Sequence, residues 1–378
     1  MFDPVSLAWA IISLTSISIT AYALNLYINI QHIFKRRHPC IKLSVQELYI
    51  YPIKSCGEIR LSSSAKVTPI GFEHDRILQV VSKVDQKNSP SEPDWSFCTP
   101  REKRYEKLFH VKPTLMDGSN NNNTNLKLSS KHVKEEFTLK LEEVLSRFGS
   151  MVTRPTFSTT MGGASPVMLE HCGIEVAKWL EEATGITGCR LVGIGENFRR
   201  FVKVNDDQGD DIPMIHEGCS SYGSGVPPPS VSLADEAPFL LTTRSSLADL
   251  NKRLGKGKQV DMRRFRPNIV IDGLQPWEED SLKRIRIGAV EFHVWQRCGR
   301  CTMTTIDRDS LERCGEPLST LSNFRERDNG QRNFGMHLIP ARPWELKEER
   351  IFVGDEVEIL EYDEERRAEW MRLFGKSS

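Results

Sequence analysis

The stretch KLSVQELYIYPIKSCG, residues 42–57, alternates apolar and polar side chains and then breaks into a turn. Its first eleven residues are rich in β-branched and aromatic side chains, which is typical of a half-buried strand. Similar strand patterns recur at residues 76–84, 268–271, 289–295, 302–306 and 357–360. Helices are expected over residues 170–183, before a Thr-Gly stop, and over residues 245–254, behind a serine cap. The chain is therefore predicted to be mainly β with flanking helices (α+β).

The composition indicates a folded and mostly soluble body. Of 378 residues, 39% are hydrophobic and 27% are charged, which is ordinary for a globular protein. The 51 basic and 51 acidic side chains balance, and this argues against a nucleic-acid partner. Nine cysteines with one close pair indicate buried intracellular thiols rather than a small disulfide scaffold.

The N-terminal segment differs from the rest of the chain. Residues 4–34 carry no charge, and basic residues follow at once at 35–37. A helix over residues 5–30 would be about 39 Å long, more than the roughly 30 Å of a bilayer core. Residues 1–38 are therefore predicted to be a membrane anchor and basic stop, with the following residues in the cytosol. The alternatives are a buried helix or a cleaved signal peptide, since residues 21–23 (AYA) resemble a cleavage site.

Three other segments are predicted to lie at the surface. The stretch at 117–125 is a polar, asparagine-rich loop, and the stretch at 218–229 is a Gly/Ser/Pro loop. The last fifteen residues are charged and helical in propensity, and we expect them to form a solvated tail.

The sharpest local motif is Arg297-Cys298-Gly299-Arg300-Cys301. A zinc site would need two more ligands, and only Cys314 lies near in the sequence. A redox dithiol would need the second cysteine to begin a helix, whereas residues 302–306 favour a strand. A single thiolate on a metal otherwise held by sulfur is a third use, and the arginines would favour the thiolate. Two buried thiols at a strand end remain the structural alternative.

Basic residues on the loops between predicted strands indicate an anionic ligand. Arginine offers planar bidentate contacts to a phosphate, and lysine offers a point charge. Each position alone is a weak signal, and their shared placement is suggestive. They are Lys54 with Ser55, Arg76, Arg101, and Arg266 with Asn268.

Seven motifs together resemble the MOSC-domain proteins, and most closely the membrane-anchored mitochondrial amidoxime-reducing components. They are YPIKSC (51–56), DR (75–76), SSLADLN (245–251), FRPNIVI (265–271), RCGRCTMTTID (297–307), FG (334–335) and VGDEVEIL (353–360). The resemblance covers residues 43–361. It implies an N-terminal MOSC β-barrel-like domain (42–165), a connecting helical region (166–200), a C-terminal MOSC β-barrel domain (201–363) and the charged tail (364–378), preceded by one transmembrane helix.

The resemblance also implies a molybdenum cofactor, Mo-molybdopterin, whose dithiolene holds the metal and whose phosphate is anionic. By motif position, Cys301 would be the catalytic thiolate on molybdenum. The residues that would bind the pterin and its phosphate are Lys54, Ser55, Arg76, Arg266, Asn268, Gly299 and Arg300. Gly299 falls where the family often has a serine. Glu236 and Ala237 replace residues beside the cofactor, and a glutamate near a phosphate would be unfavourable.

The implied function is that of a molybdenum-dependent oxidoreductase that reduces small N-hydroxylated compounds. The resemblance implies that its electrons would come from cytochrome b5 and its NADH-dependent reductase. An external donor is physically reasonable, because the sequence has no Gly-rich nucleotide fingerprint. The implied location is the mitochondrial outer membrane, with the catalytic part in the cytosol. One alternative is a cofactor or sulfur carrier, as in molybdenum cofactor sulfurases, although no pyridoxal-phosphate domain precedes the MOSC region. The other is a non-catalytic membrane protein with a decayed site.

Overall fold

The computed structural model describes residues 42–83, 95–117, 124–141, 150–153, 167–195, 198, 200–205, 211–213, 229–326 and 330–375. The predicted anchor at 1–38 lies outside these residues, as do all but the last residue of the loop at 218–229 and most of the loop at 117–125. Leu43–Ser378 belong to one compact unit. Among the described helices, none has the length and apolar character needed to cross a membrane.

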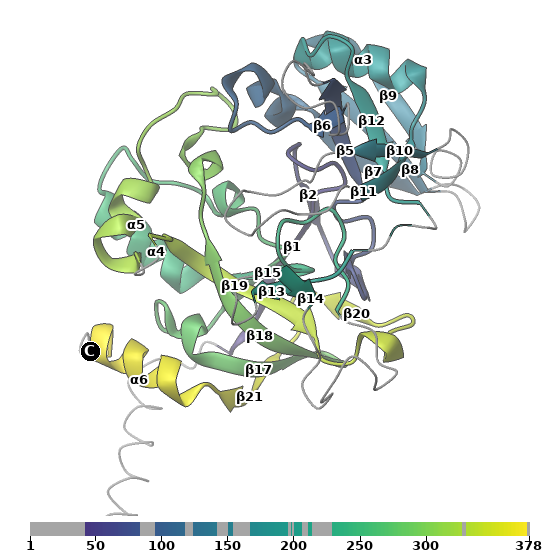
Figure 1. The fold of residues 1–378 in the computed structure, drawn as a ribbon. Coiled ribbons are helices and arrows are strands. Elements are labelled where there is room, and N and C mark those ends of the chain that lie inside the picture. Colours follow the sequence, from purple (N-terminus) through teal and green to yellow (C-terminus); the bar gives the residue numbers. More distant parts are fainter. Residues whose placement is uncertain are drawn as a thin grey trace, which may run out of the picture. The chain divides into compact units, whose positions relative to one another are not determined.

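The larger sheet has eight strands in the order β2-β1-β16-β15-β19-β18-β17-β21 (Figure 1). Only β15 and β16 run parallel, and the other neighbours are antiparallel. The strands are β1 (Ser44–Ile50), β2 (Ile59–Leu61), β15 (Phe239–Thr243), β16 (Ile269–Asp272), β17 (Leu282–Ile287), β18 (Val290–Gly299), β19 (Asn333–Pro340) and β21 (Val357–Tyr362).

This sheet curls back on itself. Strand β2 pairs only with the second half of β1, so the first half of β1 is free to meet another strand. The backbone N–H of Val45 donates to Asp355 O (2.8 Å), and the N–H of Val357 donates to Leu43 O (3.0 Å). The start of β1 therefore contacts the start of β21, at the far end of the strand order, and encloses a core of apolar side chains.

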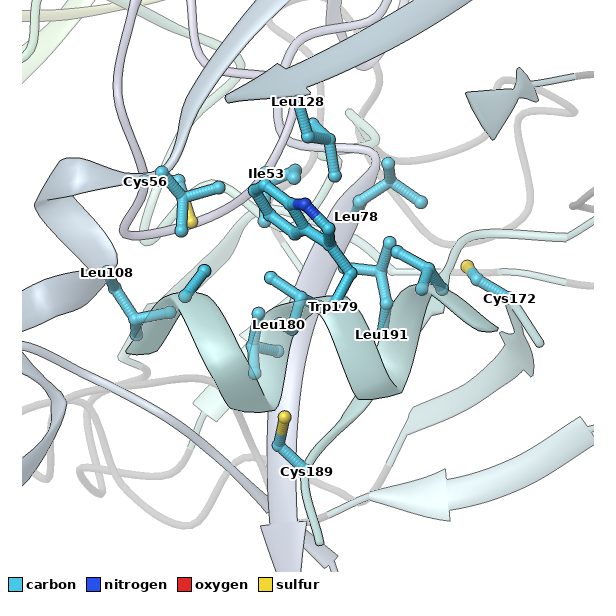
Figure 2. Packing of buried hydrophobic residues seen from close by; sticks show 14 of the residues in the cluster. Ile53, Cys56, Leu78, Leu108, Leu128, Cys172, Trp179, Leu180, Cys189 and Leu191 are labelled. Carbon is cyan, nitrogen blue, oxygen red and sulfur yellow. The ribbon is translucent and has the colours of Figure 1, made fainter. Parts of the chain in front are cut away.

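A second, smaller sheet forms a closed barrel of five strands in the order β10-β11-β12-β5-β6. Its strands are β5 (Leu78–Lys83), β6 (Trp95–Phe97), β10 (Ser150–Thr153), β11 (Val167–His171) and β12 (Arg190–Gly193). Helix α3 (Ile174–Thr184) packs Trp179 and Leu180 among Leu78 and Leu191 of this barrel (Figure 2). The mainly β prediction, with a barrel in the N-terminal half, is confirmed.

The remaining elements are short. Three small sheets join β7 (Lys112–Asp117), β8 (Thr124–Ser130) and β9 (Val133–Lys140); β20 (Arg350–Phe352), β3 (Ser64–Thr68) and β4 (Gly71–Phe72); and β13 (Lys203–Asn205) with β14 (Asp211–Pro213). The other α-helices are α4 (Arg244–Leu254), α5 (Leu318–Arg325) and α6 (Glu364–Leu373). The 3₁₀ turns are η1 (Lys103–His110), η2 (Met262–Phe265), η3 (Glu278–Ser281), η4 (Thr302–Thr305) and η5 (Pro343–Glu345).

Pairing in space does not follow the predicted order of segments along the chain. Strands β1 and β2, from the segment predicted as the N-terminal domain, lie in the eight-stranded sheet beside β16. Strands β11 and β12, from the segment predicted as a connecting helical region, complete the small barrel on either side of α3. Helix α3 starts at Ile174 rather than residue 170, because Glu170 and His171 pair with β12.

Three local predictions are wrong. Residues 302–306 do not form a strand, because Thr304 Oγ1 and Thr305 Oγ1 each donate to the carbonyl three residues earlier (2.9 and 2.8 Å) and fold the run into η4. Helix α4 is capped by Thr243, whose hydroxyl accepts from Ser246 N–H (3.1 Å), and not by a serine.

The third error concerns the C-terminal residues, which were expected to be a solvated tail. They form α6, and this helix is docked on the body. Arg366 Nη2 donates to the carbonyls of Leu282 (2.8 Å) and Val294 (3.2 Å), and Trp370 Nε1 donates to Pro276 O (3.0 Å). The indole of Trp370 also packs against a buried aromatic cluster. The residues around Trp370 are mostly charged, so this apolar contact was not evident from the sequence.

Candidate functional site

One cleft collects all eight residues that the sequence predicted for the site. They come from four separate segments: the turn after β1, the turn before β5, the link from η2 to β16, and the link from β18 to η4. The eight are Lys54, Ser55, Arg76, Arg266, Asn268, Gly299, Arg300 and Cys301. The rest of the lining is Phe97, Thr99, Arg101, residues 234–237, Leu240, Arg264, Phe265, Cys298, Met303, Thr304 and His337. Folding thus joins positions that the sequence places far apart.

Lys54 is fixed on one wall of the cleft by the loop at residues 232–235. Its Nζ donates to Leu233 O (2.7 Å) and forms an ion pair with the Asp235 carboxylate. Burial lowers the pKa of Lys54 to about 8, although the charge of Asp235 opposes this effect. Arg200 holds the same loop through the carbonyls of Ala234 (2.6 Å) and Asp235 (2.7 Å). Sequence reasoning missed Asp235, which has no motif of its own.

Arg76 and Arg266 lie against the ring of Tyr51. Their guanidinium carbons are 4.6 and 4.1 Å from the ring centre. Arg76 Nη1 donates to Asp75 (2.5 Å) and Asn268 Oδ1 (3.1 Å), and its Nη2 donates to Arg266 O (3.0 Å). Both arginines have positive φ angles (49° and 55°), so each lies at a sharp turn just before a strand. These contacts hold two cations side by side.

Two cations of the cleft lack an acidic partner. Among the described residues, no carboxylate lies within 4.0 Å of Arg266 or Arg300. Arg266 Nη1 donates to Cys56 O (2.7 Å), and Arg300 Nη2 donates to Phe265 O (2.6 Å). Burial and the charge of Arg308 lower the pKa of Arg266 to about 10. Both side chains are half-buried, and a partly desolvated charge without an acidic partner among the described residues is suited to an anionic ligand.

Unpaired donor atoms in the cleft also favour an anionic ligand. Arg101 Nε and Arg300 Nε are both buried without a hydrogen-bond partner, and both residues line the cleft. The lining has six lysine and arginine side chains and two carboxylates. The donor set therefore fits a group that carries phosphate, as a phosphorylated pterin does.

The two cysteines of the motif both line the cleft, in different surroundings. Cys301 is half-buried and directly precedes η4. Cys298 is 7% exposed in β18, and its sulfur accepts from Arg300 Nη1 (2.8 Å). Arg297, which was expected to support the thiolates, instead pairs with Asp280 (2.7 Å) and Glu369 (2.9 Å). Arg297 is absent from the cleft lining, whereas Cys298 is part of it.

The zinc alternative finds no support in this arrangement. Within the described ranges, no three His, Cys, Asp or Glu side chains are placed to hold one metal ion. Cys314 is exposed, and its sulfur contacts the carbonyl oxygens of Thr305 (3.7 Å) and Glu316 (3.4 Å). A soft metal at Cys301 would therefore need ligands from the group that carries it.

Glu236 lies in the cleft, and its carboxylate has two partners that the sequence did not predict. Its Oε2 is 3.1 Å from His337 Nε2 and accepts from Gln296 Nε2 (3.0 Å). Burial lowers the pKa of His337, but Cys298 and Glu236 outweigh it and raise the pKa to about 10. The raised pKa favours a protonated His337 next to Glu236, and a protonated imidazole would offset the charge of the glutamate. His337 follows the FG motif by two residues, within a strand whose apolar pattern gave no sign of it.

The other two departures from the family pattern, Ala237 and Gly299, place small residues at the cleft. Ala237 is buried and lines the cleft without a polar group. A Cβ added at Gly299 would lie 3.2 Å from the side chain of Gln331, which is a tight contact with a flexible group.

Comparisons with known proteins agree with this arrangement. The MOSC N-terminal beta barrel domain matches residues 42–186, and the MOSC domain matches residues 228–358. Mitochondrial amidoxime-reducing component 1 is 28% identical in Homo sapiens and 27% identical in Mus musculus. Those matches cover 84% of this chain and 83% and 82% of the relatives.

Molybdenum cofactor sulfurase from Danio rerio is 29% identical over 78% of this chain, but the match spans only 32% of that longer protein. The crystal structure of YiiM from Geobacillus stearothermophilus aligns with 38% of this chain at 15% identity and a TM-score of 0.25, which is too low to support an argument. The two domain matches together extend over most of residues 42–358. The chain is a MOSC-domain protein, in which a MOSC N-terminal beta barrel domain precedes a MOSC domain.

Proposed function

We propose that this protein binds a molybdenum cofactor in the cleft and reduces small N-hydroxylated compounds of the amidoxime or hydroxylamine type. The observation that carries the proposal is a pair of half-buried cations, Arg266 and Arg300, which have no acidic partner among the described residues and line the same cleft as the half-buried thiol of Cys301. The match to amidoxime-reducing components over more than four fifths of both chains supports the choice of reaction.

Each residue of the cleft has a distinct task in this proposal. Cys301 supplies the protein thiolate to the metal. Lys54, Arg76 and Arg266 hold the anionic end of the pterin, and Ser55, Asn268, Gly299 and Arg300 complete its contacts. When bound, the cofactor supplies the two-electron redox chemistry, while the protein supplies position and electrostatics. His337 lines the cleft, and its raised pKa suits it to hold a proton near the reacting group.

The remaining parts of the proposal concern the partners and the location. Cytochrome b5 and its NADH-dependent reductase would supply the electrons, one at a time. Residues 1–38 would anchor the protein in the mitochondrial outer membrane, with the cleft in the cytosol. The supporting observation is the uncharged run at residues 4–34 before three basic residues.

The test uses the full-length chain, purified in mild detergent from a host that makes the cofactor. Molybdenum and pterin are measured per chain, and reduction of a simple amidoxime is assayed with the donor pair. We expect about one molybdenum per chain, as one thiolate site implies. A folded protein that contains neither molybdenum nor pterin would overturn the proposal.

Two matched variants test the ligand. Cys301→Ser is expected to lose molybdenum and activity, whereas Cys314→Ser, at an exposed thiol outside the cleft, is expected to keep both. If the Cys301 variant retained full molybdenum content and full activity, the ligand assignment would be wrong.

A cofactor or sulfur carrier is the second candidate, because molybdenum cofactor sulfurases match at a similar identity. Retention of the cofactor through many turnovers with an amidoxime would favour the reductase. Transfer of the cofactor or its sulfur to an acceptor protein, without amidoxime reduction, would favour the carrier.

A further inference from the structure

Cys298 lines the cleft beside charged side chains, and the proposed cofactor contacts do not include its thiol. Arg300 Nη1 is 2.8 Å from its sulfur, and the buried ring of His337 forms part of the same wall of the cleft. Glu236 Oε2 is 3.1 Å from His337 Nε2 and is held in turn by Gln296. An arginine beside the sulfur, with an imidazole and a carboxylate lining the same cleft, provides groups that can activate a cysteine nucleophile.

Other buried thiols of the chain provide a comparison. Burial raises the pKa of Cys56 and Cys98 to about 12 and that of Cys189 to about 11. Burial acts on Cys298 as well, but the positive charges of Arg300 and His337 outweigh it and lower the pKa below the usual value. Cys298 differs from these thiols because a guanidinium donates directly to its sulfur, whereas Arg266 beside Cys56 donates to the Cys56 backbone carbonyl.

Cys301 is the nearest second thiol in the sequence. Only Gly299 and Arg300 separate it from Cys298, and both cysteines line the same cleft. Both are unpaired in this structure, and Cys301 is the more exposed of the two. This is the arrangement of a reactive thiol with a resolving thiol beside it.

We propose that Cys298 is a redox-reactive thiol, which small hydroperoxides oxidise and which Cys301 then converts to a Cys298–Cys301 disulfide. In the first step the Cys298 thiolate attacks the terminal oxygen of the hydroperoxide, and the O–O bond breaks. The alkoxide that leaves takes a proton from His337, and Cys298 becomes a sulfenic acid. In the second step the Cys301 thiol attacks this sulfur, the S–O bond breaks and water leaves.

Atoms and electrons balance in these two steps, with the hydroperoxide as the oxidant. Two thiols lose two electrons and two protons, and the hydroperoxide becomes one alcohol and one water. Because Cys301 is also the proposed metal ligand, the disulfide would block cofactor loading until a thiol reductant opened it. That consequence, unlike the thiol chemistry, rests on the proposed function.

The experiment uses the full-length chain from a host that cannot make the cofactor. The protein is treated with hydrogen peroxide at neutral pH, and the remaining thiols are alkylated and located by peptide mass mapping. We expect one peptide that spans both cysteines to become two hydrogen atoms lighter and to resist alkylation, and dithiothreitol to reverse the change. A Cys314→Ser control should behave as the parent chain does.

Further variants separate the roles of the two thiols and of the histidine. Cys298→Ser should form no disulfide and leave Cys301 open to alkylation, and Cys301→Ser should trap a sulfenic acid at Cys298. His337→Gln should slow alkylation of Cys298, since a positive charge that favours the thiolate is removed. His293→Gln, outside the cleft, should not change the rate. Melting curves of each variant confirm that it is folded.

Several outcomes decide between the inference and the proposed function. If peroxide leaves both thiols alkylatable in the folded, cofactor-free chain, the inference is wrong, whatever the molybdenum content of the loaded protein. Equal alkylation rates in the His337 and His293 variants would also overturn it. If the disulfide forms equally fast in cofactor-loaded and cofactor-free protein, the thiol chemistry stands and Cys301 is not the metal ligand.

Discussion

Arg266 is half-buried, and its guanidinium donates a hydrogen bond to a backbone carbonyl and not to a described carboxylate. Arg266→Met should lower the cofactor content of the purified protein about tenfold or more, because a charge-assisted contact to the phosphate is lost. The free energy of unfolding of the cofactor-free chain should change by less than about 1 kcal/mol, because an uncompensated charge is removed as well. Molybdenum analysis and chemical denaturation measure the two quantities.

Arg284→Met is the matched control, since Arg284 forms a surface ion pair with Glu291 (3.0 Å) and does not line the cleft. It should leave the cofactor content unchanged. An Arg266 variant that kept its cofactor would show that Arg266 has a structural role and does not bind the anion.

At this scale the sequence predicted which residues would meet in the cleft, but not all of their partners. Lys54 and Arg266 belong to motifs with fixed neighbours, so a family pattern could place them. His337 and Asp235 have no such pattern, and their roles arise from side chains that fold against them, Glu236 and Lys54. Such pairs are set by tertiary contacts, which spacing along one chain does not encode.

Within strand β19, Gly335 stands where another strand comes very close. Its φ is +82°, and an added Cβ would lie 2.6 Å from Leu241 O of the neighbouring β15. Gly335→Ala should therefore lower the free energy of unfolding by about 3 kcal/mol or more, through both strain and the clash. Gly255→Ala tests strain alone, because its φ is +78° and nothing lies within 4 Å. Gly255→Ala should lower the free energy of unfolding by about 1 kcal/mol. Equal losses in the two variants would contradict a clash at Gly335.

Helix α6 provides a second test at the scale of an element. Trp370→Ala should lower the free energy of unfolding by about 2 kcal/mol, since the indole leaves an apolar cluster and its N–H loses Pro276 O. The adjacent Met371 is 54% exposed, so Met371→Ala should have an effect below about 0.5 kcal/mol. Similar losses in the two variants would mean that the docking of α6 does not depend on the indole.

Strand and helix predictions succeeded where burial imposes a regular period, as in β1, β18 and the apolar face of α3. They failed where short-range hydrogen bonds decide the backbone. The β-branched residues 302–305 would suit a strand, yet two threonine hydroxyls fold them into a 3₁₀ turn. Helix α6 was missed as a docked element because its contacts are few and its charges many.

For the stability of the whole molecule, the buried acid Glu279 makes a pH-dependent contribution. Burial and the neighbouring Asp280 raise its pKa from 4.5 to about 7, and Ser246 Oγ donates to it (2.8 Å). A carboxyl whose folded pKa is raised binds more protons in the folded state. The stability it contributes is therefore fully present below about pH 4.5 and is lost as the pH rises through about 7.

Glu279→Gln removes this titration. Relative to the parent chain, the variant should gain stability between pH 5 and pH 8, on the order of 1–3 kcal/mol. Thermal unfolding of both proteins at the two pH values measures the difference. A constant difference between them would contradict the raised pKa of Glu279.

The sequence also predicted two β domains in the correct order along the chain, because each has its own motifs and its own apolar runs. It did not predict that β1 would complete the sheet of the second domain. Strand pairing depends on partners far away in the chain, and β1 has the same alternating pattern whichever strand it joins. Only the three-dimensional structure identifies β16 as its neighbour.

The pairing of β1 with β16 also affects folding during translation. Ser44 pairs with Asp272, so β1 leaves the ribosomal exit tunnel long before its partner and stays unpaired with β16 while the small barrel is synthesised. Domains that fold one after another during translation avoid such a delay. Here β1 can pair with β16 only after the intervening residues have been synthesised and have folded. We expect the unpaired strand of the nascent chain to need protection from aggregation until then.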